Sequence, residues 1–302
     1  MLLEAYDGLL SRALSLNDLN RINIAFGNTM TPQETVDLRE ALQDPGYRLP
    51  ELREGRKFSD AELLGAVHEW IDEMDAFLHL AGKPEAEPFL RRDLRKSVTL
   101  YTDGQPAAGK TLIVGMPGAN DRLMVPMPAM LQCLPAERVD LVMVRDGTRS
   151  AYRQGLEGLA DSLEAFADTL PDMLGFGAYR RVVGLGVSSG GLPIVLIALR
   201  LNLDAVLALG GNSPHDARWV RPGDLSPVVA LKQAAERGYA TRVTVACGAQ
   251  HEVDCASAAD TCALLGLEPL VVTADRDVKH NIVHPLLEEG RLPAFLAERL
   301  EF

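Results

Sequence analysis

From about residue 96 onward, short apolar runs alternate with stretches of helical spacing, and this alternation restricts the possible folds more than any other feature. Most of the runs are unbroken, which is typical of strands covered on both faces. Strands that alternate with helices predict a doubly wound, mostly parallel sheet, so we expect an α/β fold. The runs occupy residues 98–101, 111–116, 139–144, 181–187, 205–209, 242–247 and 269–273.

The clearest helical stretch of this region extends from about residue 153 to residue 174. Its apolar residues recur at steps of three and four, as on one face of an amphipathic helix. These residues are Leu156, Leu159, Leu163, Phe166, Leu170 and Met173.

The first third of the chain has a different pattern, without a convincing strand. A serine with a glutamate three residues later opens the segment 59–80, whose apolar residues follow helical spacing. A Thr-Pro pair at residues 31 and 32 begins another helix, because proline is favoured at the first helical position. We therefore expect a helical subdomain over residues 1–95 and an α/β domain over residues 96–302.

Composition limits the partners of this chain. Apolar residues make up 47% of it and the formal net charge is -12, so we expect a soluble protein that repels nucleic acid and anionic membranes. No apolar run is long enough to span a membrane, so no membrane insertion is expected. The acidic N-terminal segment does not read as a secretory signal, which makes the cytoplasm the expected location. The helical first third could cover the second domain or mediate homo-oligomer formation.

The four cysteines contain no C-x-x-C pair. Cys255 and Cys262 are seven residues apart, so we expect them to share one helix face as buried thiols. A zinc site would need partners at tighter spacing, and no metal is expected.

The segment Gly186–Gly190 lies between an expected strand and an expected helix. Its G-x-S-x-G pattern is typical of a sharp strand-to-helix turn that exposes a nucleophilic serine, here Ser188. The small neighbours let the two backbones pass closely. Pro193 indicates that the helix begins near Gly190, because a proline deeper in the helix would remove a backbone hydrogen bond.

Two other interpretations of this turn remain. It could be a glycine-rich turn that only packs a helix on a strand. Residues 184–190 also read as G-x-G-x-x-x-G, a variant of the dinucleotide-binding turn. Such a turn comes early in its domain, and an acid ends the next strand. Here several strands precede the turn and Asp204 begins the next one, which favours the nucleophile.

A serine nucleophile of this kind needs an acid and then a base later in the chain. Glu252 and Asp254 follow the run 242–247, and we favour Asp254 because a short side chain at a helix start is held more rigidly. The alternative role of Asp254 is an ordinary N-cap. His280 and His284 follow the last run, and we favour His280, which lies nearer the expected sheet edge, whereas His284 could cap or pack. The other four histidines are expected to be surface or core residues.

The oxyanion that forms during acyl transfer needs backbone N–H donors. One is expected from Ser189, directly after the nucleophile, and a second from the loop after the run 111–116. Gly118 or Ala119 could supply that second donor, although a plain Pro-Gly turn is the alternative.

On these motifs, residues 96–302 resemble the α/β-hydrolase superfamily. The matching parts are the elbow at residues 186–191, the loop at residues 117–119, Asp254 and His280. The loop lacks the His-Gly-Gly pattern familiar in the superfamily. The resemblance implies ester, thioester or amide hydrolysis, or acyl transfer, through an acyl-enzyme and without a metal or organic cofactor.

A narrower resemblance links the chain to bacterial hydrolase domains that accompany polysaccharide and glycoconjugate genes. It rests on the residues around Ser188 together with the segments 280–283 and 290–292. We therefore expect a serine hydrolase that cleaves an ester or thioester of a small-molecule or glycoconjugate acyl substrate. The alternatives are an acyltransferase that uses the same three residues, or a non-catalytic binding module on the same fold.

Overall fold

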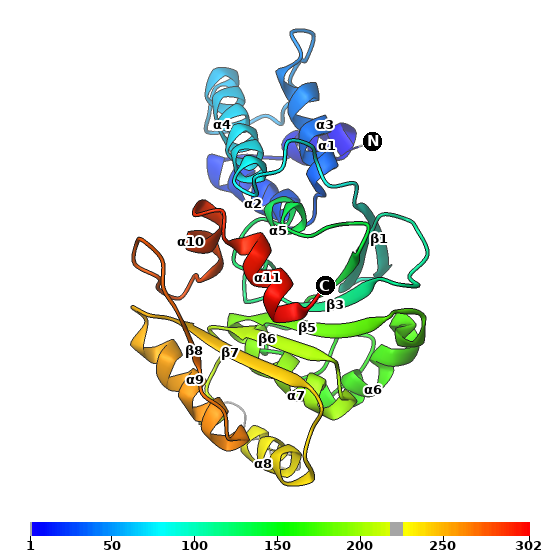
Figure 1. Cartoon of the computed structure of the whole chain (residues 1–302). Helices are drawn as coiled ribbons and strands as arrows, with labels where there is room; N and C mark the ends of the chain where they lie inside the picture. Colours follow the sequence, from blue (N-terminus) through cyan, green and yellow to red (C-terminus); the bar gives the residue numbers. More distant parts are fainter. Residues whose placement is uncertain (1, 218–225) are drawn as a thin grey trace. The chain divides into compact units, whose positions relative to one another are not determined.

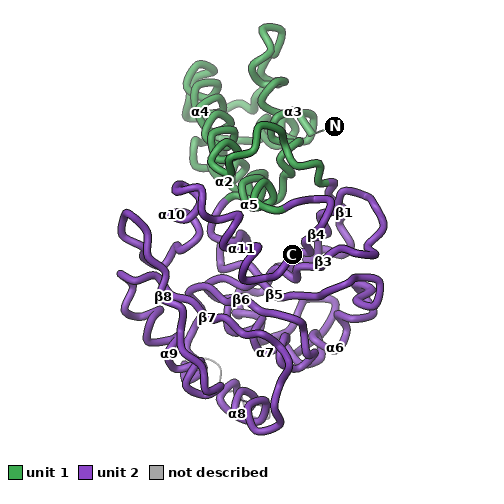
Figure 2. The backbone as a smooth tube through the Cα atoms, viewed as in Figure 1, with its two compact units in different colours: residues 1–89, 126–134 green, residues 90–125, 135–302 purple. Residues whose placement is uncertain are grey.

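The structure, a computed structural model, describes residues 2–217 and 226–302. The chain divides into two compact units, shown in different colours in Figure 2. Unit 1 comprises residues 1–89 and 126–134, and unit 2 comprises residues 90–125 and 135–302. None of the helices in the described ranges combines the length and apolar character needed to cross a bilayer.

Unit 1 consists of helices that begin at strong start signals. Ser15, Thr31 and Ser59 each form a capping box, in which the N-cap side chain and an acid three residues later satisfy each other's backbone N–H groups. Inside the unit the ring of Tyr6 stacks on that of Trp70, with their centroids 5.6 Å apart. The helices are α1 (Leu2–Leu10), α2 (Leu16–Gly27), α3 (Pro32–Gln43), α4 (Asp60–His79) and α5 (Met127–Gln132).

Unit 2 is built on an eight-stranded sheet with the order β1-β2-β4-β3-β5-β6-β7-β8. The pairs β1–β2 and β2–β4 are antiparallel and the others are parallel. The strands are β1 (Leu90–Arg95), β2 (Val98–Thr102), β3 (Thr111–Met116), β4 (Val139–Val144), β5 (Arg181–Val187), β6 (Ala205–Leu209), β7 (Arg242–Gly248) and β8 (Leu270–Val272). The α/β class expected from the apolar runs is confirmed.

Helices cover both faces of this sheet (Figure 1). Val206 and Ala208 of β6 belong to a core cluster that includes residues of α6 to α9, whereas Leu207 between them is equally buried toward the other face, where α11 packs on β6. The helices of unit 2 are α6 (Leu163–Leu174), α7 (Gly191–Leu201), α8 (Pro227–Arg237), α9 (Glu252–Leu265), α10 (Val283–Glu288) and α11 (Leu292–Leu300).

Two sequence expectations about the elements were wrong. A strand, β1, lies within the first 95 residues, where none was expected. It leaves no apolar run in the sequence because it is an exposed edge strand rich in arginine. The helix expected over residues 153–174 begins only at Leu163. Gly155 and Gly158 have positive φ angles, which end any helix there, and Ser162 caps the later start by accepting from the Ala165 N–H.

Candidate active site

Ser188 lies at the sharp turn between β5 and α7 and has a φ of 51°, the left-handed conformation that a side chain rarely adopts. The glycines around it make the turn feasible. A Cβ at residue 186 would lie 2.4 Å from the Gly190 carbonyl oxygen, and one at residue 190 would lie 2.1 Å from the Met116 oxygen. The strained serine is therefore presented at the carboxyl edge of the sheet.

Pro193 fits this turn because α7 begins at Gly191. The proline is the third helical residue, within the first turn, where backbone N–H groups have no partner inside the helix. The helix start near Gly190 that the proline indicated is confirmed.

His280 joins the serine to a carboxylate. Its Nε2 atom lies 3.1 Å from Ser188 Oγ, and its Nδ1 atom lies 2.7 Å from Asp254 Oδ2. Ser188 follows β5, Asp254 lies in the first turn of α9 after β7, and His280 lies in the loop after β8. The carboxyl ends of these parallel strands meet at one edge, so residues 92 positions apart in sequence come within hydrogen-bond distance.

The end of β6 fits tightly against this pair. Gly210 has a φ of 58°, and a Cβ there would lie 2.9 Å from Asp254 Oδ2 and 3.3 Å from His280 Nδ1. A residue with a side chain would be strained and would also push against the hydrogen bond between acid and base. Glycine at this position therefore lets the backbone support the pair.

The structure distinguishes between the two acids and the two histidines. Asp254 is buried against His280, whereas Glu252 is exposed at the first position of α9. Asp254 is the third residue of that helix rather than its N-cap. His284 contacts Arg276 and Glu288, and its ring is not the one next to the serine.

The hydrogen bond to Asp254 raises the pKa of His280 above its usual value, although burial acts in the opposite direction. The carboxylate stabilises the charged form of the ring, which makes His280 a stronger base toward the serine proton. The same bond fixes the Nδ1–H tautomer and leaves the Nε2 lone pair directed at Ser188.

Comparison with known proteins supports the fold. No protein-family model matches the sequence, and no curated protein matches it either. FphF, a fluorophosphonate-binding serine hydrolase of Staphylococcus aureus, matches with a TM-score of 0.50 and 15% identity, over 71% of this chain and 99% of that chain. The chain has the α/β-hydrolase fold.

Two further solved structures are similar to this chain. Est1E of Butyrivibrio proteoclasticus has a TM-score of 0.47 and 14% identity, over 72% of this chain and 100% of that chain. The S-formylglutathione hydrolase FrmB of Staphylococcus aureus has a TM-score of 0.47 and 12% identity, over 70% of this chain and 96% of that chain.

The loop after β3 lies directly against the serine. A Cβ on Gly118 would lie 3.0 Å from the Ser188 Cβ atom. The Gly118 N–H faces its own loop, 3.4 Å from the Arg122 oxygen, whereas within the described ranges the exposed Ala119 N–H donates to no protein group. Ser189 is half-buried and directly follows Ser188. Gly118 therefore lies beside Ser188, Ser189 follows it in the chain, and Ala119, the residue after Gly118, has an N–H that is unused within the described ranges.

Tyr152, in the loop after β4, is a residue that the sequence interpretation missed. Its buried hydroxyl lies 2.9 Å from the Val144 oxygen and 3.1 Å from the Pro117 oxygen. The Pro117 carbonyl and the Gly118 N–H belong to one rigid peptide group, so anchoring the first also orients the second. Tyr152 thereby connects the loop after β4 to the loop beside the serine.

These two loops hold most of the unusual backbone. Five non-glycine residues within them have positive φ, a conformation that costs of order 1–3 kcal/mol and is found most often near functional sites. They are Asp121, Met124, Arg149, Ala151 and Tyr152.

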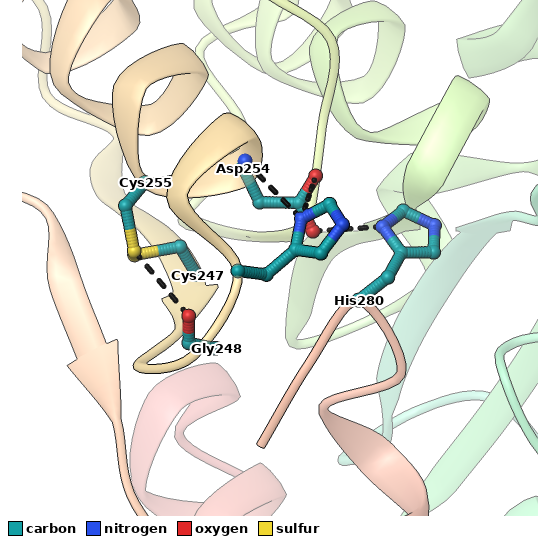
Figure 3. The surroundings of a disulfide bond; sticks show 6 residues. Cys247, Gly248, Asp254, Cys255 and His280 are labelled. Atoms are coloured by element: carbon teal, nitrogen blue, oxygen red, sulfur yellow. Dashed lines mark hydrogen bonds and ion pairs between the residues drawn. A yellow bond between two sulfur atoms is a disulfide. The ribbon is translucent and has the colours of Figure 1, made fainter. Parts of the chain in front are cut away.

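A disulfide fixes the other side of the site (Figure 3). It joins Cys247, at the end of β7, to Cys255, the residue after Asp254. We expected Cys255 and Cys262 to be buried thiols on one helix face, which was wrong for Cys255 because the first turn of α9 packs against the end of β7. Cys262 is a buried free thiol whose pKa burial raises to about 11, so it is a poor nucleophile at neutral pH.

His251 is the second residue that the sequence interpretation missed. It was grouped with the surface and core histidines, but it is the N-cap of α9, and its Nδ1 atom lies 3.1 Å from Asp254 Oδ1. Its spacing of three residues from Asp254 at a helix start could have indicated this contact, because N-cap and third-residue groups face each other.

Proposed function

We propose that this protein is a serine hydrolase that cleaves an ester or thioester through an acyl-enzyme. The observation that carries the proposal is the position of His280, hydrogen-bonded through one ring nitrogen to Asp254 and through the other to the strained Ser188. This is the geometry of a nucleophile, a general base and an orienting acid, in the chain order serine, acid, histidine.

The reaction has two stages. In the first, Ser188 Oγ attacks the acyl carbonyl carbon while its proton passes to His280 Nε2, and Asp254 stabilises the charged ring. The tetrahedral intermediate then collapses as His280 gives the proton to the departing alkoxide or thiolate. An acyl ester of Ser188 remains.

In the second stage His280 takes a proton from water, and the resulting nucleophile attacks the acyl-enzyme. Collapse of this intermediate releases a carboxylic acid and returns the proton to Ser188 Oγ. In both stages the oxyanion is bound by the Ser189 N–H and a donor at Gly118 or Ala119. The closeness of Gly118 to Ser188 and the unused Ala119 N–H support this assignment.

The substrate class we propose is a small-molecule or glycoconjugate acyl ester or thioester. Its acyl carbonyl has to reach a half-buried serine beside an exposed loop, which suits a substrate that presents an accessible acyl group. A screen of acetyl and longer acyl esters and thioesters, each measured with the parent protein and with Ser188→Ala, tests this class. Turnover by the parent alone supports the proposal.

Labelling by a fluorophosphonate probe separates an enzyme from a non-catalytic module, because the probe reacts with an activated serine. We expect the parent protein to be labelled, Ser188→Ala to remain unlabelled, and both to have melting temperatures within a few degrees. Ser189→Ala is the matched control, since it removes an adjacent hydroxyl and keeps the backbone N–H. Labelling of Ser188→Ala at the parent rate would overturn the proposed nucleophile.

A further inference from the structure

Two imidazole rings face the carboxylate of Asp254. His280 Nδ1 lies 2.7 Å from Oδ2, and His251 Nδ1 lies 3.1 Å from Oδ1. One potential ligand atom from each of the three residues lies within 4.8 Å of the other two. The rings themselves are close, with centroids 5.5 Å apart. Hydrolysis needs only His280 from this pair of rings, so the second imidazole has no role in the mechanism above.

The helix cap does not explain His251 well. Serine, threonine, aspartate and asparagine are the strong N-cap residues, whereas histidine is not among them. The cap hydrogen bond from the Asp254 N–H to His251 Nδ1 is 3.3 Å long. The side chain of His251 is 34% exposed and that of His280 is 45% exposed, so both rings can be reached from solution, whereas the Asp254 side chain between them is 8% exposed.

The three ligand types match the preferences of one metal in particular. Two imidazole nitrogens and a carboxylate oxygen, with water as a fourth ligand, are a recurrent set for Zn²⁺. Zn–N bonds of about 2.0–2.1 Å put two ligand atoms about 3.3 Å apart in a tetrahedral site. Ligand atoms that already lie within 4.8 Å can reach this spacing by side-chain rotation. Mg²⁺ and Ca²⁺ prefer oxygen ligands and do not suit the pair of rings.

The framework around the cluster is rigid on the carboxylate side. The disulfide between Cys247 and Cys255 ties the first turn of α9 to the end of β7, and Asp254 lies next to Cys255 (Figure 3). The Gly210 backbone restricts Asp254 from the β6 side. Only the two imidazole rings need to move to close around an ion.

From these contacts we propose that His251, Asp254 and His280 form an inhibitory Zn²⁺ site that overlaps the catalytic residues. Binding of the ion depends on the three side chains alone. Its inhibitory effect rests on the proposed function.

The mechanism of inhibition follows from the tautomer of His280. For catalysis the Nδ1 atom holds the proton and Nε2 offers a lone pair to Ser188. Zn²⁺ needs the Nδ1 lone pair, so the neutral ring must carry its single proton on Nε2 instead. That nitrogen then donates to Ser188 Oγ and cannot accept its proton. Replacing the acid by asparagine in the serine protease triad causes the same tautomer error and costs about 10⁴-fold in kcat.

Calorimetric titration with ZnCl₂ tests the site independently of hydrolysis when Ser188→Ala protein is used. Reductants are left out, because they chelate Zn²⁺ and open the disulfide. We expect one ion per chain, and an affinity at least about tenfold lower when His251→Ala is added. His284→Ala is the matched control, a half-buried imidazole outside the cluster, and should leave the affinity unchanged. Absence of binding, or equal affinity without His251, overturns the site.

Fluorophosphonate labelling of protein with Ser188 intact tests the inhibitory effect. We expect Zn²⁺ to slow labelling at least about a hundredfold, a chelator to restore it, and MgCl₂ to have no effect. For His251→Ala, each labelling rate is divided by the rate of that variant without metal, and the same slowing should require at least about tenfold more Zn²⁺. A protein that binds Zn²⁺ through His251 yet is labelled equally fast contradicts the inhibitory role. A protein that is never labelled contradicts the proposed function, while calorimetry still decides the site.

Discussion

The two sides of the sheet edge around Ser188 are held in place by different means. On the side of β6 to β8, glycine backbone at Gly210, a disulfide and the first turn of α9 fix the acid and the base. On the side of β3 and β4, two loops rich in positive φ angles approach the serine, and the buried Tyr152 hydroxyl connects them. The side with Asp254 and His280 (the acid–base side) is braced by covalent and short-range contacts, whereas the loops proposed to bind the oxyanion (the oxyanion side) have strained backbone and are held by side-chain hydrogen bonds such as that of Tyr152.

This difference predicts that substitutions on the acid–base side act on the chemical step directly, while those on the oxyanion side act through loop position. The rate of catalysis is sensitive to small displacements, since misplacing a reacting group by about 1 Å can lower the rate about a hundredfold. The acid–base side should therefore give the largest effects.

The largest effect is expected from Asp254→Asn. It keeps the shape of the acid but allows the wrong tautomer of His280, so kcat should fall at least about a hundredfold. Glu252→Gln, two residues earlier and exposed, should cost less than about tenfold. Steady-state kinetics on variants with unchanged melting temperatures measure both values, and the reverse ordering would transfer the orienting role to Glu252.

Gly210→Ala should lower kcat by about tenfold or more, because its Cβ would press on Asp254 Oδ2 at 2.9 Å and disturb the acid–base pair. Gly266→Ala is the matched control, with φ of 70° and open space around its Cβ. Both variants should lose about 1 kcal/mol or more of the free energy of unfolding from the positive φ. Equal activity in the two variants would mean that residue 210 does not support the pair.

On the oxyanion side, Tyr152→Phe removes the hydroxyl that anchors the Pro117 peptide. We expect kcat to fall about fivefold with little change in KM, since the serine and base remain in place. Tyr6→Phe in unit 1 removes another buried hydroxyl, 2.8 Å from Asn23 Oδ1, and should cost about 1 kcal/mol of stability without lowering kcat. A loss of kcat in Tyr6→Phe as large as in Tyr152→Phe would point to a general loss of structure.

The smallest change is a shift in the pH profile. The hydrogen bond to Asp254 raises the pKa of His280, so the His280 ring stays protonated to higher pH than a free imidazole. His280 can act as a base only when it is neutral, so activity should appear as the pH rises through this raised pKa. In Asp254→Asn this cause is removed, so the acidic limb of kcat/KM should move to lower pH. Profiles of kcat/KM against pH, recorded with a chelator present, measure the shift. An acidic limb that moves to higher pH, or does not move, would contradict Asp254 as the partner of His280.

The sequence predicts the strands and the turn at Ser188 better than it predicts contacts between distant segments, for physical reasons. The strands β3 to β6 are almost entirely buried and mainly apolar, and the elbow at Ser188 needs glycines at fixed offsets, so both leave local signals. Strand β1 leaves none, because its edge position tolerates charged residues.

The missed residues depend on contacts between distant segments. Tyr152 acts through Pro117, which lies 35 positions away, and no local pattern encodes that contact. Leu156 and Leu159 have helical spacing, yet Gly155, Gly158 and Ser162 decide the backbone. His251 differs, because its spacing of three residues from Asp254 at the start of α9 is a local signal.

In the proposed reaction, Ser188 carries the acyl group during turnover. Protein mixed with an activated ester, quenched in acid within the first turnovers and digested, reports the site of acylation by peptide mass. We expect one acyl group on the peptide that contains Ser188, at Ser188 itself, and none in Ser188→Ala. An acyl group on Ser189 or elsewhere, or turnover by Ser188→Ala at the parent rate, would contradict it.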